Sequence, residues 1–317
     1  MKRLVYIDVL KAFASLLIFN FHSFILFPEK ISILSFGGDI GNNLFFMISG
    51  FLLYSKINKY SINDFSQYYL PRLKRILPSV LLFYILSMIF CNVEVNNFYD
   101  IVVNFVFPSM FWFASAILFF YLFVFYQIKL FSKQTNFIIV LILLLLHVLF
   151  DGILVERYVI GYISILCGYY INEYFDAIKN KSSIFVTLLF LILYAVLKVL
   201  YKYGINPIGL VHLFIGIFII AFCINLIALF SKYEFIIDSF LSKHIYLSRL
   251  INIVSSCTLE IYILGVYNNL LIERMINKYF SFPFSYIICL CIIVCISYMI
   301  YCVWSLIWKK KKIRKQY

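Results

Sequence analysis

The sequence predicts an all-α integral membrane protein, a polytopic bundle of about ten transmembrane helices with both termini in the cytoplasm. Of its 317 residues, 64% are hydrophobic and only 13% are charged, which is more apolar surface than a soluble fold can bury. Apolar runs about as long as a membrane span recur along the whole chain. Because no stretch has the composition of an independent domain or a long linker, we expect a single transmembrane domain over residues 1–317.

The apolar runs place the ten spans along the chain, two of them, 40–56 and 135–150, shorter than the others. The spans are 4–27, 40–56, 76–93, 108–128, 135–150, 157–173, 183–202, 207–230, 250–272 and 283–308. With a cytoplasmic N-terminus, 20 of the 27 Lys and Arg residues lie in cytoplasmic segments and six lie outside, as the positive-inside rule requires.

This orientation also explains the net charge of +13. We therefore expect no nucleic-acid partner, and we expect the basic tail at 309–315 to contact membrane lipids. Most of the eight cysteines fall inside apolar runs, where they act as small hydrophobic residues. Cys289, Cys291 and Cys295 have no nearby His or carboxylate in the sequence, so no metal site is expected.

Four polar residues in the first predicted span share one helix face. Asp8, Lys11, Ser15 and His22 are separated by three, four and seven residues, the spacing of a single helical stripe. Lys11 and His22 point the same way about 16 Å apart along the axis. In one interpretation Asp8 neutralises Lys11, which extends towards the cytoplasm, and His22 caps the helix end. In the other, the stripe lines a polar path, because ionisable groups inside a membrane usually face a bundle interior.

His22 is the candidate catalytic base in the second interpretation, because imidazole can accept and return a proton near neutral pH. Lys11 is the second candidate catalytic residue, at the other end of the same stripe.

Three segments occur in an order that is typical of one family. They are "YIDVLKAFASLLIFNFHS" at 6–23, "GGDIGNNLFFMISGFLL" at 37–53 and "YYLPRLKRILPSV" at 68–80. Together they resemble acyltransferase family 3, the integral membrane acyltransferases that include bacterial polysaccharide O-acetyltransferases. Lys11 and His22 match the family's basic residue followed after ten others by histidine, although arginine is more frequent at the first position.

Arg72 and Arg75 resemble the family's Arg-x-x-Arg motif at the cytoplasmic start of the third span. Topology alone also predicts basic residues here. The two guanidinium groups share a helix face and suit phosphate recognition. With Lys74 between them and Lys11 in the first helix, they are the expected binding residues for the phosphates of coenzyme A.

Two further matches depart from the family pattern. Around Trp112 the Trp-Phe signature is similar, but the paired glutamates of many members are missing. "SSCTLEIYILGVY" at 255–267 is similar to a segment that usually ends in Tyr-Leu-x-His, and here Gly265 stands at the histidine position. Glu260 is either a substitute for that histidine or a partner for a neighbouring helix.

Four residues in or just before the second predicted span are candidates for binding the acceptor, and Asp39, Asn42 and Asn43 among them lie at its predicted outer end. Asp39, Asn42 and Asn43 could orient a sugar hydroxyl or cap the helix. Ser49 could donate a hydrogen bond into the polar path or, like Gly50, allow close helix packing.

The resemblance implies a multi-pass protein of the bacterial cell membrane that transfers an acyl group, acetyl above all, from cytoplasmic acetyl-CoA to a hydroxyl of a cell-surface or lipid-linked glycan. Acetyl-CoA would be a substrate, with no tightly bound cofactor. His22 would either deprotonate the acceptor or become acylated. The alternatives are a glycan flippase or transporter, and a catalytically degenerate scaffold, which Gly265 would favour.

Overall fold

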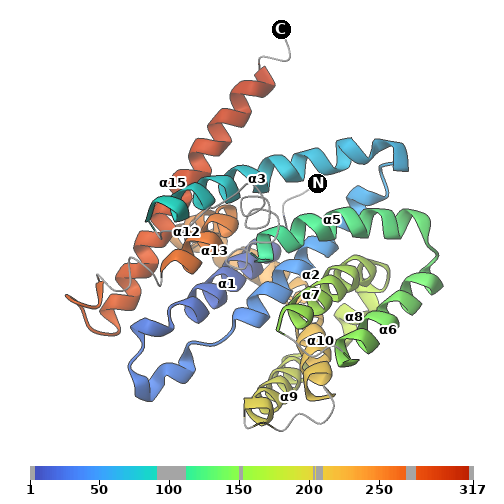
Figure 1. Cartoon of the computed structure of the whole chain (residues 1–317), viewed down its shortest axis with the longest axis horizontal. Coiled ribbons are helices and arrows are strands. Elements are labelled where there is room, and N and C mark those ends of the chain that lie inside the picture. Colours follow the sequence, from blue (N-terminus) through green and yellow to red (C-terminus); the bar gives the residue numbers. More distant parts are fainter. Residues whose placement is uncertain are drawn as a thin grey trace. The chain divides into compact units, whose positions relative to one another are not determined.

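The computed structural model describes residues 4–90, 112–149, 153–202, 204, 210–268 and 276–313. Every element in these ranges is helical (Figure 1), which confirms the all-α fold class. The chain divides into two compact units. Unit 1 comprises residues 1–10, 42–70 and 119–243, and unit 2 comprises residues 11–41, 71–118 and 244–317.

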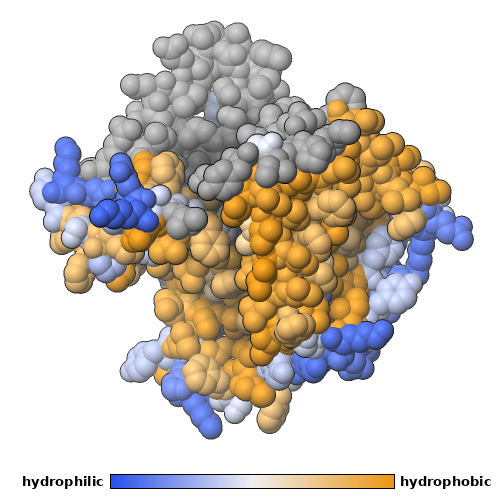
Figure 2. All heavy atoms as spheres, turned by 90° about the horizontal axis from the view of Figure 1, so that it is seen from below, coloured by the Kyte–Doolittle hydropathy of each residue, from blue (hydrophilic) through white to orange (hydrophobic). Residues whose placement is uncertain are grey.

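Five described helices are long and apolar enough to cross a membrane. They are α1 (Val5–His22), α5 (Trp112–Leu130), α9 (Ile184–Lys202), α10 (Leu210–Lys232) and α15 (Phe284–Ile313). A bent pair of shorter helices would make a sixth span. Figure 2 shows a face covered largely by apolar side chains, with hydrophilic ones gathered in a few groups. The chain is therefore a multi-pass membrane protein, while the number of ten spans and the cytoplasmic termini stay predictions.

Unit 1 is organised around α10, the most hydrophobic of its helices. This helix packs along α9 and also contacts α6 (Lys133–Leu149), α7 (Ile153–Tyr170) and α8 (Phe175–Lys181); α9 and α10 lie side by side in Figure 1. The short helix α11 (Glu234–Lys243) follows α10 and exposes Phe235 and Ile236. The segment 231–249, which connects the predicted spans 207–230 and 250–272, is thus mostly helical.

The helix α2 (Gly38–Ile57) crosses α7 within unit 1 at two glycines. A Cβ on Gly50 would lie 1.9 Å from the backbone oxygen of Ile165, and a Cβ on Gly168 would lie 2.1 Å from that of Met47. No side chain fits between two backbones at this separation. The packing role predicted for Gly50 is therefore confirmed.

Unit 2 contains the larger, C-terminal parts of α1 and of the long helix α3 (Phe65–Phe90), together with α12 (Ile245–Ser256), α13 (Thr258–Asn268) and α15. The helix α3 begins eleven residues before the predicted span at 76–93 and passes through Pro71 and Pro78. The segment between the predicted spans 40–56 and 76–93 is therefore partly helical, and its Arg and Lys residues at 72–75 stand on α3.

The predicted span at 250–272 is not one straight helix. The axes of α12 and α13 differ by 68°, with the break at Cys257. Side chains just before the break bond back to the backbone: Ser256 Oγ donates to the carbonyl of Asn252 at 2.6 Å, and Cys257 Sγ to that of Ile253 at 3.1 Å. Such bonds compete with the helical ladder and favour bending. The remainder of this span, 269–272, lies outside the described residues.

Candidate active site

The polar stripe predicted for the first span lies on a real helix, because α1 runs without interruption from Val5 to His22. Ser15 Oγ donates to the carbonyl oxygen of Lys11 at 3.0 Å. His22 is the last residue of the helix and is half-buried. Lys11 and His22 therefore face the same side of α1, about 16 Å apart along its axis.

His22 lies against an aromatic cluster within unit 2. Its ring meets that of Tyr262, on α13, edge to face at a centroid separation of 6.4 Å. The Tyr262 ring also contacts Phe113 at 4.9 Å, and Phe113 in turn contacts Trp112 at 6.2 Å. Trp112, Phe113 and Tyr262 are all buried. Tyr262 of α13 thus contacts the imidazole directly, Phe113 of α5 lies behind Tyr262, and the predicted site residue Trp112 belongs to this cluster.

The end of α1 that carries His22 is fixed by Asn20, two residues earlier. Asn20 Nδ2 donates to the carbonyl oxygens of Leu34 at 2.7 Å and Phe36 at 3.0 Å. The hydroxyl of Tyr286, on α15, donates to Asn20 Oδ1 at 3.1 Å. A single amide side chain therefore joins α1 to the segment after it and to α15.

The return of the chain after α1 depends on glycines. Gly37 has φ +105°, a conformation that residues with a side chain rarely adopt. At the start of α2, a Cβ on Gly41 would lie 2.7 Å from the backbone oxygen of Ala14. The loop that resembles the family's glycine-containing segment thus allows α2 to begin in direct contact with α1.

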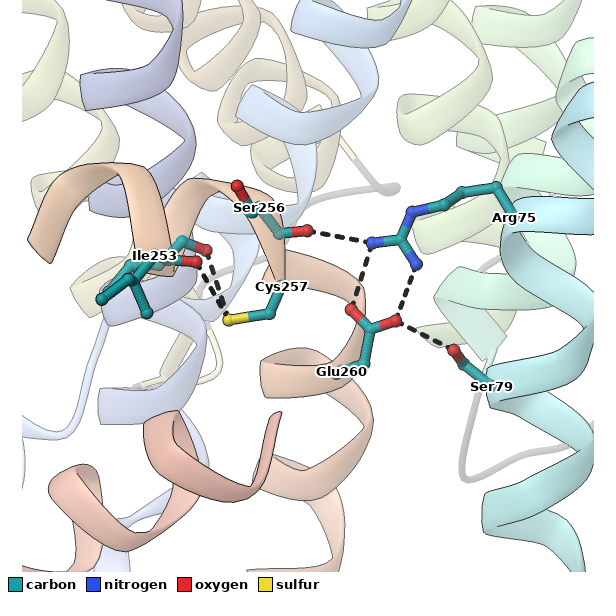
Figure 3. Close-up of polar contacts among 7 residues, drawn as sticks. Arg75, Ser79, Ile253, Ser256, Cys257 and Glu260 are labelled. Carbon is teal, nitrogen blue, oxygen red and sulfur yellow. Dashed lines mark hydrogen bonds and ion pairs between the residues drawn. The ribbon is translucent and has the colours of Figure 1, made fainter. Parts of the chain in front are cut away.

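A second polar centre in unit 2 joins α3 to α13 (Figure 3). Arg75 Nη1 donates to Glu260 Oε1 at 2.7 Å, and Arg75 Nη2 to Oε2 at 3.1 Å. Ser79, one turn along α3, donates to Oε1 at 2.9 Å. The Glu260 side chain is fully buried, whereas that of Arg75 is 39% exposed. Three donors therefore compensate the cost of burying this carboxylate.

The same guanidinium also donates a hydrogen bond to a backbone carbonyl at the break between α12 and α13. Arg75 Nη2 donates to the carbonyl oxygen of Ser256, the last residue of α12, at 3.0 Å. The positive charge of Arg75 lies at a helix C-terminus and the negative charge of Glu260 in the first turn of α13, the ends that each charge stabilises. These bonds hold the bend between α12 and α13. They also show that the partner of Glu260 is Arg75, on a neighbouring helix.

Arg72 and Lys74 stand on α3 beside this centre in sequence. Arg72 is one turn before Arg75 and is half-buried, and Lys74 is exposed. At the start of α3, hydrogen bonds from the hydroxyl and the amide of Ser61 hold the pKa of Asp64 below its usual value. Asp64 is thereby engaged within its own turn, where it also accepts a hydrogen bond from Gln67 Nε2 at 3.2 Å.

The candidate acceptor residues divide between the units. Asp39 lies in the first turn of α2, in unit 2. Asn42, Asn43 and Ser49 belong to unit 1, where the buried Oδ1 of Asn43 accepts a hydrogen bond from Ser164 Oγ at 2.7 Å. Asn43 therefore ties α2 to α7 in addition to any role in binding.

Sequence reasoning missed Asn20, Ser79 and Tyr286. Asn20 is one polar residue among apolar neighbours, and nothing in the sequence links it to Tyr286, 266 residues away. Phe113 belongs to the Trp-Phe signature, but nothing in the sequence links it to Tyr262. In the described part of the chain, no group of three or more His, Cys, Asp or Glu side chains could hold a metal ion.

A family model described as an acyltransferase domain matches residues 4–302 and so includes residues of both units. Neither the curated proteins nor the solved structures gave a match to the chain. The aromatic cluster around His22, the Arg75–Glu260 pair and the five apolar helices all lie within the matched range. The chain belongs to acyltransferase family 3 and is a membrane acyltransferase.

Proposed function

We propose that this protein is a membrane O-acyltransferase that transfers an acyl group from cytoplasmic acyl-CoA, with acetyl-CoA the expected donor, to a hydroxyl of a cell-surface or lipid-linked glycan. The observation that carries the proposal is the position of His22. It ends a helix that carries Lys11 three turns earlier, and it lies against the buried ring of Tyr262. An imidazole beside an apolar aromatic wall is suited to proton transfer away from bulk water.

His22 acts as the general base. The unprotonated ring nitrogen of the neutral imidazole takes the proton of the acceptor hydroxyl as the oxygen attacks the thioester carbonyl. The carbon–sulfur bond then breaks, and the leaving thiolate takes the proton back from His22. The products are the acylated glycan and free coenzyme A, and the imidazole returns to its starting state.

The donor enters from the end of unit 2 that carries the cations of α3. Arg72 and Lys74 contact its phosphates, and Lys11 lies on the way to His22. Arg75 does not bind the donor itself, because its guanidinium is already bonded within the protein. Its Nη1 donates to Glu260, and its Nη2 donates to Glu260 and to the Ser256 carbonyl. It positions α13, and through α13 the ring of Tyr262 against His22.

Transfer of label from [14C]acetyl-CoA to the lipid-linked and polysaccharide fractions of membranes from the source cells tests this function. His22→Ala should lower labelling at least about 100-fold, the usual contribution of a general base. His244→Ala is the matched control, because it also removes an imidazole, from the exposed residue before α12, and should retain full activity. Unchanged labelling by a folded His22→Ala protein would overturn the proposal.

The same label distinguishes general-base catalysis by His22 from a mechanism in which His22 itself is acylated. If His22 were acylated, wild-type protein incubated with labelled donor and no acceptor would carry label after denaturing electrophoresis. Under the general-base mechanism the protein stays unlabelled, and label appears only in the glycan.

The broken helix supports a second candidate function, a glycan flippase or transporter. Transporters use interrupted helices whose ends face the transported substrate, and α12 and α13 are interrupted at Cys257. Here, however, the break is occupied by Arg75 and Glu260. Glycan translocation that persists in His22→Ala, without any acyl transfer by the wild type, would favour transport.

A further inference from the structure

Two chain segments meet at the end of unit 2 that carries His22 (Figure 1). The first, 23–37, follows α1, and the second, 276–283, precedes α15. Asn277 Nδ2 donates to the carbonyl oxygen of Ile25 at 3.1 Å, so the two segments are in direct contact. They therefore form one continuous surface at the end of α1.

A cluster of aromatic rings packs these segments onto α1 and α15. The ring of Phe27 contacts those of Phe282 at a centroid separation of 5.2 Å and of Tyr286, on α15, at 5.4 Å. Tyr286 in turn contacts Phe19 of α1 at 5.2 Å. The segments are thus fixed to the ends of two helices that are long and apolar enough to cross a membrane.

The surface that the segments form is rich in exposed apolar side chains. Six of them, on the segments and on the first residue of α15, are between 47% and 80% exposed: Phe24, Leu34, Phe36, Tyr279, Phe280 and Phe284. We refer to these six side chains as the apolar rim. Single exposed apolar residues are common on proteins, but six on two adjoining short segments form a patch that needs a partner.

The apolar rim continues the exposed apolar surface of the two helices. Phe21, one turn before Phe24, is exposed on α1, and Ile287, one turn after Phe284, is exposed on α15. Exposed apolar side chains of helices that cross a membrane face lipid. The rim therefore extends a lipid-facing surface past the ends of both helices.

Charged and polar side chains on the same segments indicate the level of the rim in the membrane. Glu29 and Lys30 are exposed on the first segment, and Asn277 and Lys278 on the second. Charged groups are costly in the hydrocarbon core, and exposed aromatic rings are unfavourable in water. The boundary between lipid and water suits both, and aromatic rings beside charged groups are typical of it.

The backbone of 23–37 also suits this boundary. Much of it forms two short 3-10 helices, η1 (Phe24–Leu26) and η2 (Glu29–Leu34). At the start of η2, the amide of Ile31 donates to the carbonyl oxygen of Pro28 at 2.9 Å. Peptide groups that are paired within the segment cost less to move out of water than unpaired ones.

We propose that the apolar rim binds the lipid–water boundary of one membrane leaflet, and that His22 therefore lies at the level of the lipid headgroups. The partner is the bilayer itself: the upper parts of its acyl chains contact the rings, and its headgroups contact the charged side chains. This placement goes beyond the proposed function and does not depend on it. Under that function, the acceptor hydroxyl reaches the imidazole at the membrane surface.

Tryptophan fluorescence of the purified full-length protein in phosphatidylcholine nanodiscs tests the placement. Phe24→Trp and Tyr279→Trp put one indole on each segment, and the signal of the three natural tryptophans is subtracted with the wild type. Lipids brominated at different positions along the acyl chain report the depth of each indole. Both should lie about 5 to 10 Å into the headgroup–acyl boundary, and acrylamide should quench them less than tryptophan in solution.

Ile296→Trp is the matched control for depth. Ile296 is exposed on α15, twelve residues after Phe284 and so about 18 Å farther along the helix axis. Its indole should lie near the bilayer centre, because the hydrocarbon core is about 30 Å thick. Thermal unfolding identifies any variant that fails to fold, and the two rim positions test the placement separately.

Two results would overturn the proposal. If no brominated lipid quenches the indoles at positions 24 and 279, and acrylamide quenches them as freely as tryptophan in solution, the rim lies in water. If they are quenched most by the same lipids as Ile296→Trp, the rim lies in the hydrocarbon core. Neither result affects the general-base role of His22, because these measurements contain no acyl donor and the labelling experiment tests that role by itself.

Discussion

Arg75 and Glu260 form a forked ion pair, with N–O distances of 2.7 and 3.1 Å, between the middle of α3 and the first turn of α13. The carboxylate is fully buried, so its charge depends on its partners in the protein rather than on water. Nη2 of the same guanidinium also donates to the Ser256 carbonyl, and so provides a partner for the last carbonyl of α12. One side chain thus holds together three helices of unit 2.

Arg75→Ala should destabilise the protein by about 3 to 5 kcal/mol, because it leaves a buried carboxylate without its cation. Arg75→Lys should recover part of this loss, since an ammonium keeps the charge but cannot bond to both oxygens in a fork. Thermal unfolding in detergent measures the effect.

Lys133→Ala is the control for that measurement. It removes another ion pair of 2.6 Å, with Glu173, whose Lys133 side chain is 68% exposed, so it should cost less than about 1 kcal/mol. The double variant Arg75→Ala/Glu260→Ala should be more stable than Arg75→Ala alone. Equal unfolding temperatures for Arg75→Ala and Lys133→Ala would contradict the importance of the buried pair.

Arg72→Ala and Lys74→Ala should each weaken coenzyme A binding, by roughly tenfold where a charged hydrogen bond to phosphate is lost. The combined variant should also lose most of the salt dependence of binding. Titration of coenzyme A at two ionic strengths measures both effects. Lys278→Ala, which removes an exposed lysine of unit 2 outside α3, should bind like the wild type; if it weakens binding equally, the attraction is a general effect of charge.

Gly50→Ala and Gly265→Ala should have opposite effects on stability, although both add one methyl to a buried helical glycine. At Gly50 the methyl would lie 1.9 Å from a backbone oxygen of α7, and forcing the helices apart should cost about 1 to 3 kcal/mol or more. At Gly265 nothing described lies within 4 Å, so the better helix former should stabilise α13 by up to about 1 kcal/mol. Unfolding temperatures compare the two variants directly. A strongly destabilised Gly265→Ala would show that other atoms do lie against this glycine.

Asn20→Ala should loosen the segment that follows α1, because two hydrogen bonds to the carbonyls of Leu34 and Phe36 are lost. At roughly 1 kcal/mol for each bond, amide hydrogen exchange in residues 27–37 should accelerate by about tenfold or more. Tyr286→Phe removes the one bond to Asn20 Oδ1 and keeps the other two, so it should change exchange there much less. Identical exchange in Asn20→Ala and the wild type would show that the segment is held by other contacts.

The sequence was sufficient to predict the helical class, the stripe of α1 and the close packing at Gly50, because each depends on local periodicity or on the absence of a side chain. It also pointed to Arg75 and Glu260, but as separate candidates. Their pairing could not be predicted from periodicity, since the two residues lie 185 positions apart and many other carboxylates and cations were equally available.

The break at Cys257 shows a second limit of prediction. Sequence signals for a helix break are Pro and Gly, and residues 255–258 contain neither. The bend is produced instead by Ser256 and Cys257 bonding to earlier carbonyls and by a guanidinium from another helix. The bond from the guanidinium of Arg75 is the unusual one. It cannot be predicted without knowing that α3 packs against the break.

The shared guanidinium of Arg75 also restricts how this chain can change over time. Replacing it would remove a donor from two acceptors at once, the Glu260 carboxylate on α13, which would keep only the Ser79 hydroxyl, and the carbonyl at the end of α12. Replacing Glu260 alone would leave a cation beside a helix break with one acceptor fewer. Among relatives that keep the bend, the two positions should therefore vary in concert, and a lineage that straightens α12 and α13 into one helix should lose both charges together.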